Sequence, residues 1–219
     1  MALTSGQAKT RINRIIKGYG ARRNLLGRRL TGGKLYEAWI LAEVLDSLRI
    51  HESLAPAFVG SNMLTLKSSP GPINASYPHF VLMKGSVKEF EVWTDVEFIG
   101  QTFTLNPSAP ALMPGHYHEL DIVVVPAGVT GRPHHDQVAI GVECKNTSFQ
   151  KHMVRAALGV RRELSMYVGP SSTPFTMWPS ATVEAFPPSV LLVYSTDSKI
   201  LNYSASGDVF SIDFRHNTI

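Results

Sequence analysis

Three charged residues at the ends of apolar runs have the types and spacing that metal chemistry needs. Asp121 lies in HELDIVVV, and Glu143 and Lys145 lie two positions apart in GVECKN. Residues two apart on a β-strand point to the same face, so Glu143 and Lys145 share one face and Cys144 lies on the other. Charges at a buried strand end cost free energy unless they are compensated. Either a surface salt bridge between Glu143 and Lys145 or a bound metal ion would compensate them.

The metal that these residues favour is a hard divalent cation, Mg²⁺ or Mn²⁺. Such cations prefer oxygen ligands, which Asp121, Glu143 and the backbone carbonyl of Cys144 offer if the two strands are neighbours. A bound cation lowers the pKa of a coordinated water and offsets charge that develops on a phosphate. Lys145 would then orient or deprotonate that water, or neutralise the phosphate. Glu119 shares the face of Asp121 and is expected to be a neighbour of the site rather than a ligand.

A further carboxylate, Glu37, lies in a helix predicted over residues 34–50. An apolar stripe runs along this helix through Ile40, Leu41, Val44, Leu45 and Leu48. Glu37 falls within the stripe, one turn before Leu41. Two interpretations stay open: Glu37 is a half-exposed acid in the first helical turn that the helix dipole favours, or it reaches the site of Asp121.

Hydrophobic periodicity and turn residues predict the elements that must position these side chains. A second helix is expected over 149–167, and a Pro-rich loop over 170–188. Strands are expected at 79–83, 89–100, 102–105, 118–128, 137–146, 189–196 and 208–214. This order predicts an α/β (α+β) domain with a mixed central sheet flanked by helices. The segment 56–118 is a β-rich elaboration of it.

The motif resembles that of the PD-(D/E)xK nuclease superfamily, which has the restriction-endonuclease-like fold. Asp121 on one strand and Glu143-Cys144-Lys145 at the end of the next carry the resemblance. Glu37 matches an extra acid that many members have on the first helix. The strict motif has proline before the aspartate, where this chain has Leu120. The family's helix–strands–helix–strand core is similar to residues 34–50 and 79–215, within a nuclease domain over 34–219.

The resemblance implies a Mg²⁺- or Mn²⁺-dependent nuclease that hydrolyses phosphodiester bonds, with DNA favoured over RNA. The metal would be bound by Asp121, Glu143, Glu37 and the Cys144 carbonyl. Lys145 would activate or position the attacking water. The implied setting is restriction, phage defence or DNA repair, as a homodimer or larger assembly and with a partner protein of a defence system. Two alternatives remain: a non-catalytic nucleic-acid-binding or assembly module on the same fold, and a ligand-sensing domain that uses segment 56–118.

The charge distribution favours a polyanionic partner. Net charge is +4, but the first 36 residues contain no acid and hold Lys9, Arg11, Arg14, Lys17, Arg22, Arg23, Arg28, Arg29 and Lys34. We therefore expect a basic N-terminal arm over 1–33 that attracts nucleic acid, or else a solubilising tail. The predicted phosphate contacts are Arg22, Arg23, Arg28 and Arg29 of the arm, and Lys151 and Arg155 of the second helix.

Composition narrows the class of protein further. The chain has 219 residues, of which 44% are hydrophobic and 17% charged, as in globular domains. Its single cysteine excludes a disulfide framework within the chain and fits a reducing cytosol. We find no membrane-spanning apolar run and no apolar signal-peptide core. The expectation is a cytoplasmic protein without membrane partners.

Overall fold

The computed structural model describes residues 4–19, 30, 32–60, 63–106, 108 and 111–219. The helices are α1 (Ser5–Lys17), α2 (Gly32–Glu52), α3 (Gln101–Thr104), α4 (Lys151–Leu164) and α5 (Ser204–Asp208), with 3-10 turns η1 (Pro114–His116), η2 (His135–Gln137) and η3 (Ser198–Tyr203). The strands are β1 (Ala55–Val59), β2 (His79–Lys84), β3 (Val87–Ile99), β4 (Tyr117–Pro126), β5 (Ile140–Lys145), β6 (Met166–Ser172), β7 (Thr182–Phe186), β8 (Val190–Ser195) and β9 (Ile212–His216).

One mixed sheet organises these elements. Its strand order is β1-β2-β3-β4-β5-β8-β9. Neighbours from β1 to β5 pair antiparallel, whereas β5–β8 and β8–β9 pair parallel. Strand β8, VLLVYS, is buried at every residue, as expected for a strand covered on both faces. The predicted class, a mixed sheet flanked by helices, is confirmed.

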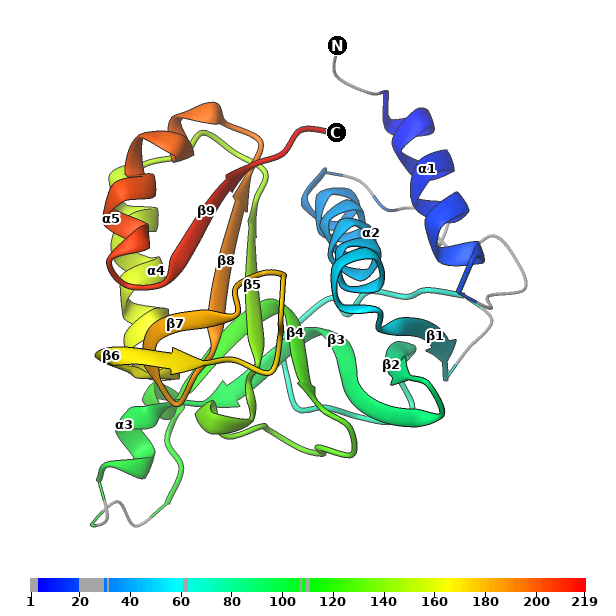
Figure 1. Ribbon diagram of the computed structural model, residues 1–219. Coiled ribbons are helices and arrows are strands. Elements are labelled where there is room, and N and C mark those ends of the chain that lie inside the picture. The colour runs from blue at the N-terminus through cyan, green and yellow to red at the C-terminus, as the bar shows by residue number, and fades with distance from the viewer. Residues whose placement is uncertain (1–3, 20–29, 31, 61–62, 107, 109–110) are drawn as a thin grey trace.

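Helices cover the sheet on both faces (Figure 1). On one face, α2 packs over a core that includes Ile122, Val142 and Leu192. On the other, α4 and η3 pack over a second core that includes Val123 and Leu191. The strands therefore alternate between two buried faces, which explains why the central ones read as continuous apolar runs.

Helix α1 joins the first of these cores. Ala8, Ile12 and Ile16 recur every four residues, form one face of the helix and are fully buried against the core that α2 shares. Thr4 and Gln7 form a capping box that fixes where α1 begins. This part of the predicted basic arm is thus packed on the body. The predicted phosphate contacts Arg22, Arg23, Arg28 and Arg29 lie outside the described residues.

Three local predictions are wrong. Residues 102–105, expected as a strand, belong to helix α3 and the residue after it, where the Thr102 backbone N–H donates to the Glu163 carboxylate of α4. The expected loop 170–188 contains most of a separate two-stranded sheet, β6–β7, in which Val183 and Ala185 alternate inward. The last strand begins at Ile212 rather than 208, because the chain first completes α5 and turns at Ser211, whose φ is 55°.

Candidate metal centre

Three carboxylates from three different elements converge beside the N-terminal part of α2. Glu37 of α2, Asp95 of β3 and Asp121 of β4 each place one oxygen within 4.8 Å of the other two. Over the part of the chain that the structure describes, this is the one group of three or more acidic, His or Cys side chains so arranged. Glu37 and Asp121 belong to the predicted site, whereas Asp95 was not predicted.

The ladder between β3 and β4 is irregular at Asp95 and Asp121, and this irregularity orients their side chains. Thr94 pairs with Ile122 and Val96 pairs with Leu120, so Asp95 and Asp121 face each other across the ladder. Asp95 has a φ of 51°, in the left-handed region that few non-glycine residues adopt.

Both strands change faces at this point of the ladder. Val92 and Ile122 pack in the core on the α2 side, whereas Val96 and Leu120 pack in the core on the α4 side. Strict alternation would place Val92 and Val96 of β3 on one face, and likewise Leu120 and Ile122 of β4. Alternation predicts that Leu120 and Ile122 share one face, whereas the structure places them on opposite faces of the sheet. This loss of phase leaves room for both carboxylates beside Glu37.

Asp95 is the most buried member of the group, with 1% of its surface exposed. Its Oδ1 accepts a hydrogen bond from Lys34 Nζ at 2.5 Å, and the same ammonium donates to Glu37 Oε2 at 2.6 Å. Its Oδ2 is buried and has no hydrogen-bond partner among the described residues. Burial raises the pKa of Asp95, and Lys34 opposes that rise. One ammonium thus serves two carboxylates and leaves a buried oxygen unsatisfied.

Asp121 links the group to the GVECKN segment. Its Oδ2 accepts the backbone N–H of Cys144 at 2.6 Å, which ties the end of β5 to β4 beyond their last ladder pair. Burial raises the pKa of Asp121, and the hydrogen bond from Cys144 lowers it in part. Cys144 packs at the border of the α2-side core, where burial and the charges of Asp121 and Glu37 raise the pKa of its thiol, so it does not face away from these carboxylates as alternation predicted.

Glu143 and Lys145 form an ion pair beside this group. Lys145 Nζ lies 2.5 Å from Glu143 Oε2, so the predicted salt bridge is present. Burial raises the pKa of Glu143 to about 7, against the attraction of Lys145, and the charge of Asp121 adds to the rise. Glu143 is not a member of the three-carboxylate group, although the charge of Asp121 contributes to the rise of its pKa.

Glu37 lies inside the site rather than at the helix start. Glu37 lies five residues after Gly32, where the helix begins. Its side chain is 12% exposed and forms an ion pair with Lys34. Its pKa is raised to about 7, first by burial and then by the charges of Asp121 and Asp95, while Lys34 opposes the rise. The carboxylates therefore destabilise each other's charged forms, which is the electrostatic condition that a bound cation relieves.

The remaining predicted residues lie farther from this chemistry. Glu119 is exposed, and burial and the charge of Asp121 raise its pKa. Lys151 and Arg155 are exposed on α4, where they are open to solvent. Sequence reasoning missed the cationic partner Lys34, which it counted only among the basic residues of the first 36 positions. The signal for Asp95 was an acid in the middle of the otherwise strand-like EFEVWTDVEFIG.

Comparison of the chain with family models, with curated proteins and with solved structures gave no match. None of the helices in the described ranges combines the length and the apolar character that crossing a membrane requires.

Proposed function

We propose that this chain is a divalent-metal-dependent nuclease that hydrolyses phosphodiester bonds, with DNA as the favoured substrate. The observation that carries the proposal is the convergence of Glu37, Asp95 and Asp121, in which Asp95 has a buried oxygen without a hydrogen-bond partner among the described residues. The Glu143–Lys145 pair next to Asp121 adds a further carboxylate and a positive charge beside these three acids.

The residues present fit a hard divalent cation. The donor set consists of carboxylate oxygens, the ligands that Mg²⁺ and Mn²⁺ prefer. Glu37 and Asp95 share the single ammonium of Lys34, Asp121 accepts only the backbone N–H of Cys144 among the described residues, and Oδ2 of Asp95 lacks a donor among them. Glu37, Asp95 and Asp121 would hold the ion. Glu143 and the Cys144 carbonyl remain predicted ligands.

A divalent ion bound there would supply an acidified water and charge neutralisation at the phosphate. The chain's own groups have separate tasks. Lys145 carries a positive charge, because attraction to Glu143 outweighs the burial that would lower its pKa. This ammonium is suited to stabilise negative charge on a phosphate oxygen. Lys34 keeps Glu37 and Asp95 in place and partly neutralised before substrate arrives.

The order of the elements also supports the proposal. Helix α2, strands β3, β4 and β5, helix α4 and strand β8 follow the helix–strands–helix–strand order of the restriction-endonuclease-like core, with Asp121 on the middle strand of the meander and Glu143 on the next. We therefore propose this core for residues 34–219. Strands β1 and β2 and the β6–β7 sheet would be additions to it.

The direct test is cleavage of supercoiled plasmid DNA, and in parallel of single-stranded RNA, in Mn²⁺ and in Mg²⁺. We expect wild-type protein to cut DNA, EDTA to stop it, and Lys145→Ala to slow it by about a hundredfold or more. Lys88→Ala, an exposed lysine on β3, is the matched control and should cut like wild type.

Several results of this assay would contradict the proposal. The proposal fails if wild type cuts neither nucleic acid, or if Lys145→Ala and wild type cut alike. Salt-sensitive DNA binding by a wild-type protein that does not cut would instead favour the non-catalytic module. Because one such site cuts one strand, double-strand cleavage should accompany a dimer or larger assembly on size-exclusion chromatography.

A further inference from the structure

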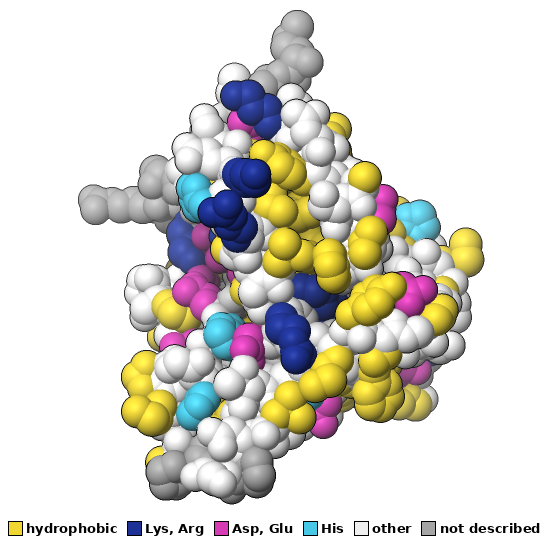
Figure 2. All heavy atoms as spheres, turned by 90° about the vertical axis from the view of Figure 1, so that its left-hand side faces the viewer, with side chains coloured by type: hydrophobic (Ala, Val, Ile, Leu, Met, Phe, Trp, Pro, Cys, Tyr) yellow, Lys and Arg dark blue, Asp and Glu magenta, His cyan; other side chains and the backbone are white. Residues whose placement is uncertain are grey.

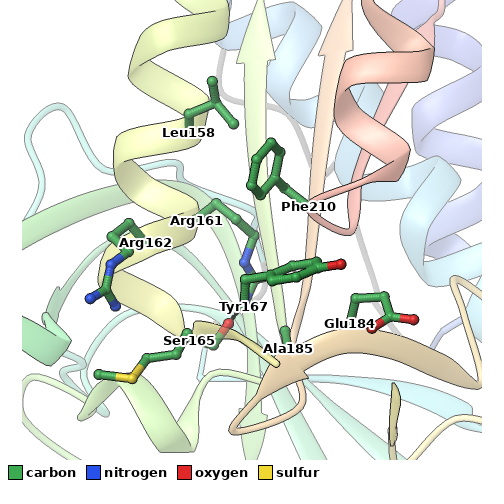
Figure 3. A pocket seen from close by; sticks show the side chains of 9 residues that line it. Leu158, Arg161, Arg162, Ser165, Tyr167, Glu184, Ala185 and Phe210 are labelled. Atoms are coloured by element: carbon green, nitrogen blue, oxygen red, sulfur yellow. Dashed lines mark hydrogen bonds between the residues drawn. The ribbon is translucent and has the colours of Figure 1, made fainter. Parts of the chain in front are cut away.

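A cavity of about 460 Å³ lies between α4, the β6–β7 sheet and Phe210, which follows α5, away from the carboxylates. Its walls include Leu158, Arg161, Ser165, Tyr167, Glu184 and Phe210 (Figure 3). Arg161 is anchored to Ser189, the residue before β8, whereas Lys145 pairs with Ser195 at the other end of that strand. Six residues of strand, roughly 20 Å, thus separate the two sites along β8.

Arg161 is a buried cation without an anionic partner. It is 4% exposed, and its Nη1 donates to the Ser189 carbonyl at 2.9 Å. Its Nη2 donates to the hydroxyls of Ser189 and Ser165, and its Nε has no hydrogen-bond partner within the described ranges. All of these acceptors are neutral, and no described acid forms an ion pair with Arg161. Burial lowers its pKa to about 10, so the side chain is still charged at neutral pH.

A desolvated guanidinium of this kind is costly unless an anion accompanies it. Guanidinium groups match carboxylates and phosphates in shape and hydrogen bonding. The Ser165 hydroxyl lines the cavity and accepts from Arg161, so its own proton is left to donate to an anion. The neighbouring Arg162 is occupied elsewhere, since its Nη1 donates to Gln101 of α3 at 2.6 Å.

Most of the other walls of the cavity are apolar, with Glu184 as a charged exception. Leu158 of α4, Tyr167 of β6 and Phe210 after α5 surround the space near Arg161 (Figure 3). The rings of Tyr167 and Phe210 lie edge to face, 6.0 Å apart, yet they are 60% and 40% exposed. Figure 2 shows that hydrophobic side chains gather on this face of the molecule, with Lys and Arg side chains among them. Such walls suit an apolar, ring-sized body.

We infer that this cavity binds a small organic anion, with its apolar body between Leu158, Tyr167 and Phe210 and its carboxylate or phosphate group at Arg161 and Ser165. The cavity volume lies in the range of small-ligand sites. Glu184, also at the wall, disfavours highly charged ligands and sets a preference for anions of low charge. The inference stands independently of the proposed nuclease activity.

The test is isothermal titration calorimetry of the full-length protein with three probes that share one ring system: 1-naphthoate, 1-naphthyl phosphate and neutral 1-naphthalenemethanol. We expect one binding site for at least one of the anions and an affinity about tenfold or more lower for the alcohol. Stronger binding of naphthoate would identify the natural head group as a carboxylate, and stronger binding of naphthyl phosphate would identify a phosphate. Equal affinity for the alcohol, or no binding of either anion, would overturn the inference.

Two variants locate the binding. Phe210→Ala removes an exposed wall and should lower the affinity for the anion about fivefold or more. Val209→Ala, at an exposed neighbouring position outside the cavity, should bind the anion like wild type. Arg161→Met should lose the preference for the anion over the alcohol. If that variant does not fold, Phe210→Ala decides: unchanged affinity in Phe210→Ala would rule out this cavity as the binding site.

Discussion

The two ends of helix α2 hold buried glutamates in opposite states. At the C-terminal end, Glu52 is 8% exposed, and its two oxygens accept the backbone N–H groups of residues 176–178 and the Thr176 hydroxyl. Near the N-terminal end, Glu37 shares the single ammonium of Lys34 with Asp95 and lies against two other carboxylates. The protein completes the environment of Glu52 but not that of the Glu37 group.

The pKa values of the two glutamates reflect this difference. Burial raises the pKa of Glu52, but the hydrogen bonds from residues 176–178 together lower it below the ordinary value. Burial raises the pKa of Glu37 to about 7, and one lysine does not reverse the rise. A carboxylate that backbone donors saturate has a structural role, whereas for a group whose members repel each other and have few donors we propose the binding of an external cation. The predictions below test that contrast.

The largest effect should come from removing the charge of the unsatisfied acid. Asp95→Asn keeps the side-chain shape, and asparagine tolerates the positive φ of this position. We expect Mn²⁺-dependent DNA cleavage to fall by about a hundredfold or more, because the variant loses a ligand. Glu97→Gln, which removes a charge two residues away on β3 and outside the group, is the matched control. Equal activity in Asp95→Asn and Glu97→Gln would remove Asp95 from the site.

The next effect concerns stability at the other end of α2. Glu52→Gln should lower the free energy of unfolding by about 2–3 kcal/mol, because several buried N–H groups lose a charged acceptor. Urea unfolding measures it, with Asp208→Asn as an exposed control. The cleavage rate per folded molecule should not change. A loss no larger than that of the control would contradict the structural role of Glu52.

The contribution of Glu52 should also depend on pH. Because its folded pKa is lower than its unfolded pKa, the stabilisation is complete above the unfolded value and is lost as pH falls through the folded value. The difference in unfolding free energy between wild type and Glu52→Gln should therefore be full at about pH 7 and shrink toward about pH 3. A difference that grows on acidification has the wrong sign for this account.

The smallest expected change is the stability of Asp95→Asn without metal. The variant loses the ion pair with Lys34, but it also loses repulsion from Glu37 and Asp121 and the cost of an unsatisfied charged oxygen. These contributions oppose each other, so we expect the free energy of unfolding to change by less than about 1 kcal/mol. A loss as large as that of Glu52→Gln, measured by the same urea titration, would mean that Asp95 is a structural acid like Glu52.

How much of the site the sequence revealed depended on local regularity. Strand alternation singled out Asp121, Glu143 and Lys145, and helical periodicity singled out Glu37, because each lies in an element whose pattern extends over several residues. Of these, the structure brings Glu37 and Asp121 together in the three-carboxylate group. Asp95 escaped, because a left-handed residue and a joint change of face in β3 and β4 turn it toward α2. No pattern within one strand encodes a change of phase that two strands make together.

The fold shows the same limit. The elements that position the carboxylates, β3, β4, β5 and α2, were all predicted near their observed bounds. Segments with weak local signals were not predicted correctly. Pro and Gly in β6–β7 and the segment between them predicted a loop. Apolar alternation in TFTL predicted a strand, whereas hydrogen bonding to Glu163 stabilises helix α3 there. Glu52 received no notice, because its partners at residues 176–178 lie far away in sequence.

Binding of Mn²⁺ tests the central claim most directly, because it needs no substrate. Electron paramagnetic resonance of free Mn²⁺ during a titration counts the ions that the protein removes from solution. We expect wild type and Glu97→Gln to bind Mn²⁺ alike, and Asp95→Asn to bind at least about tenfold more weakly. Mn²⁺ that stays free in the presence of wild type, or that Asp95→Asn binds as tightly, would contradict a metal centre at Glu37, Asp95 and Asp121.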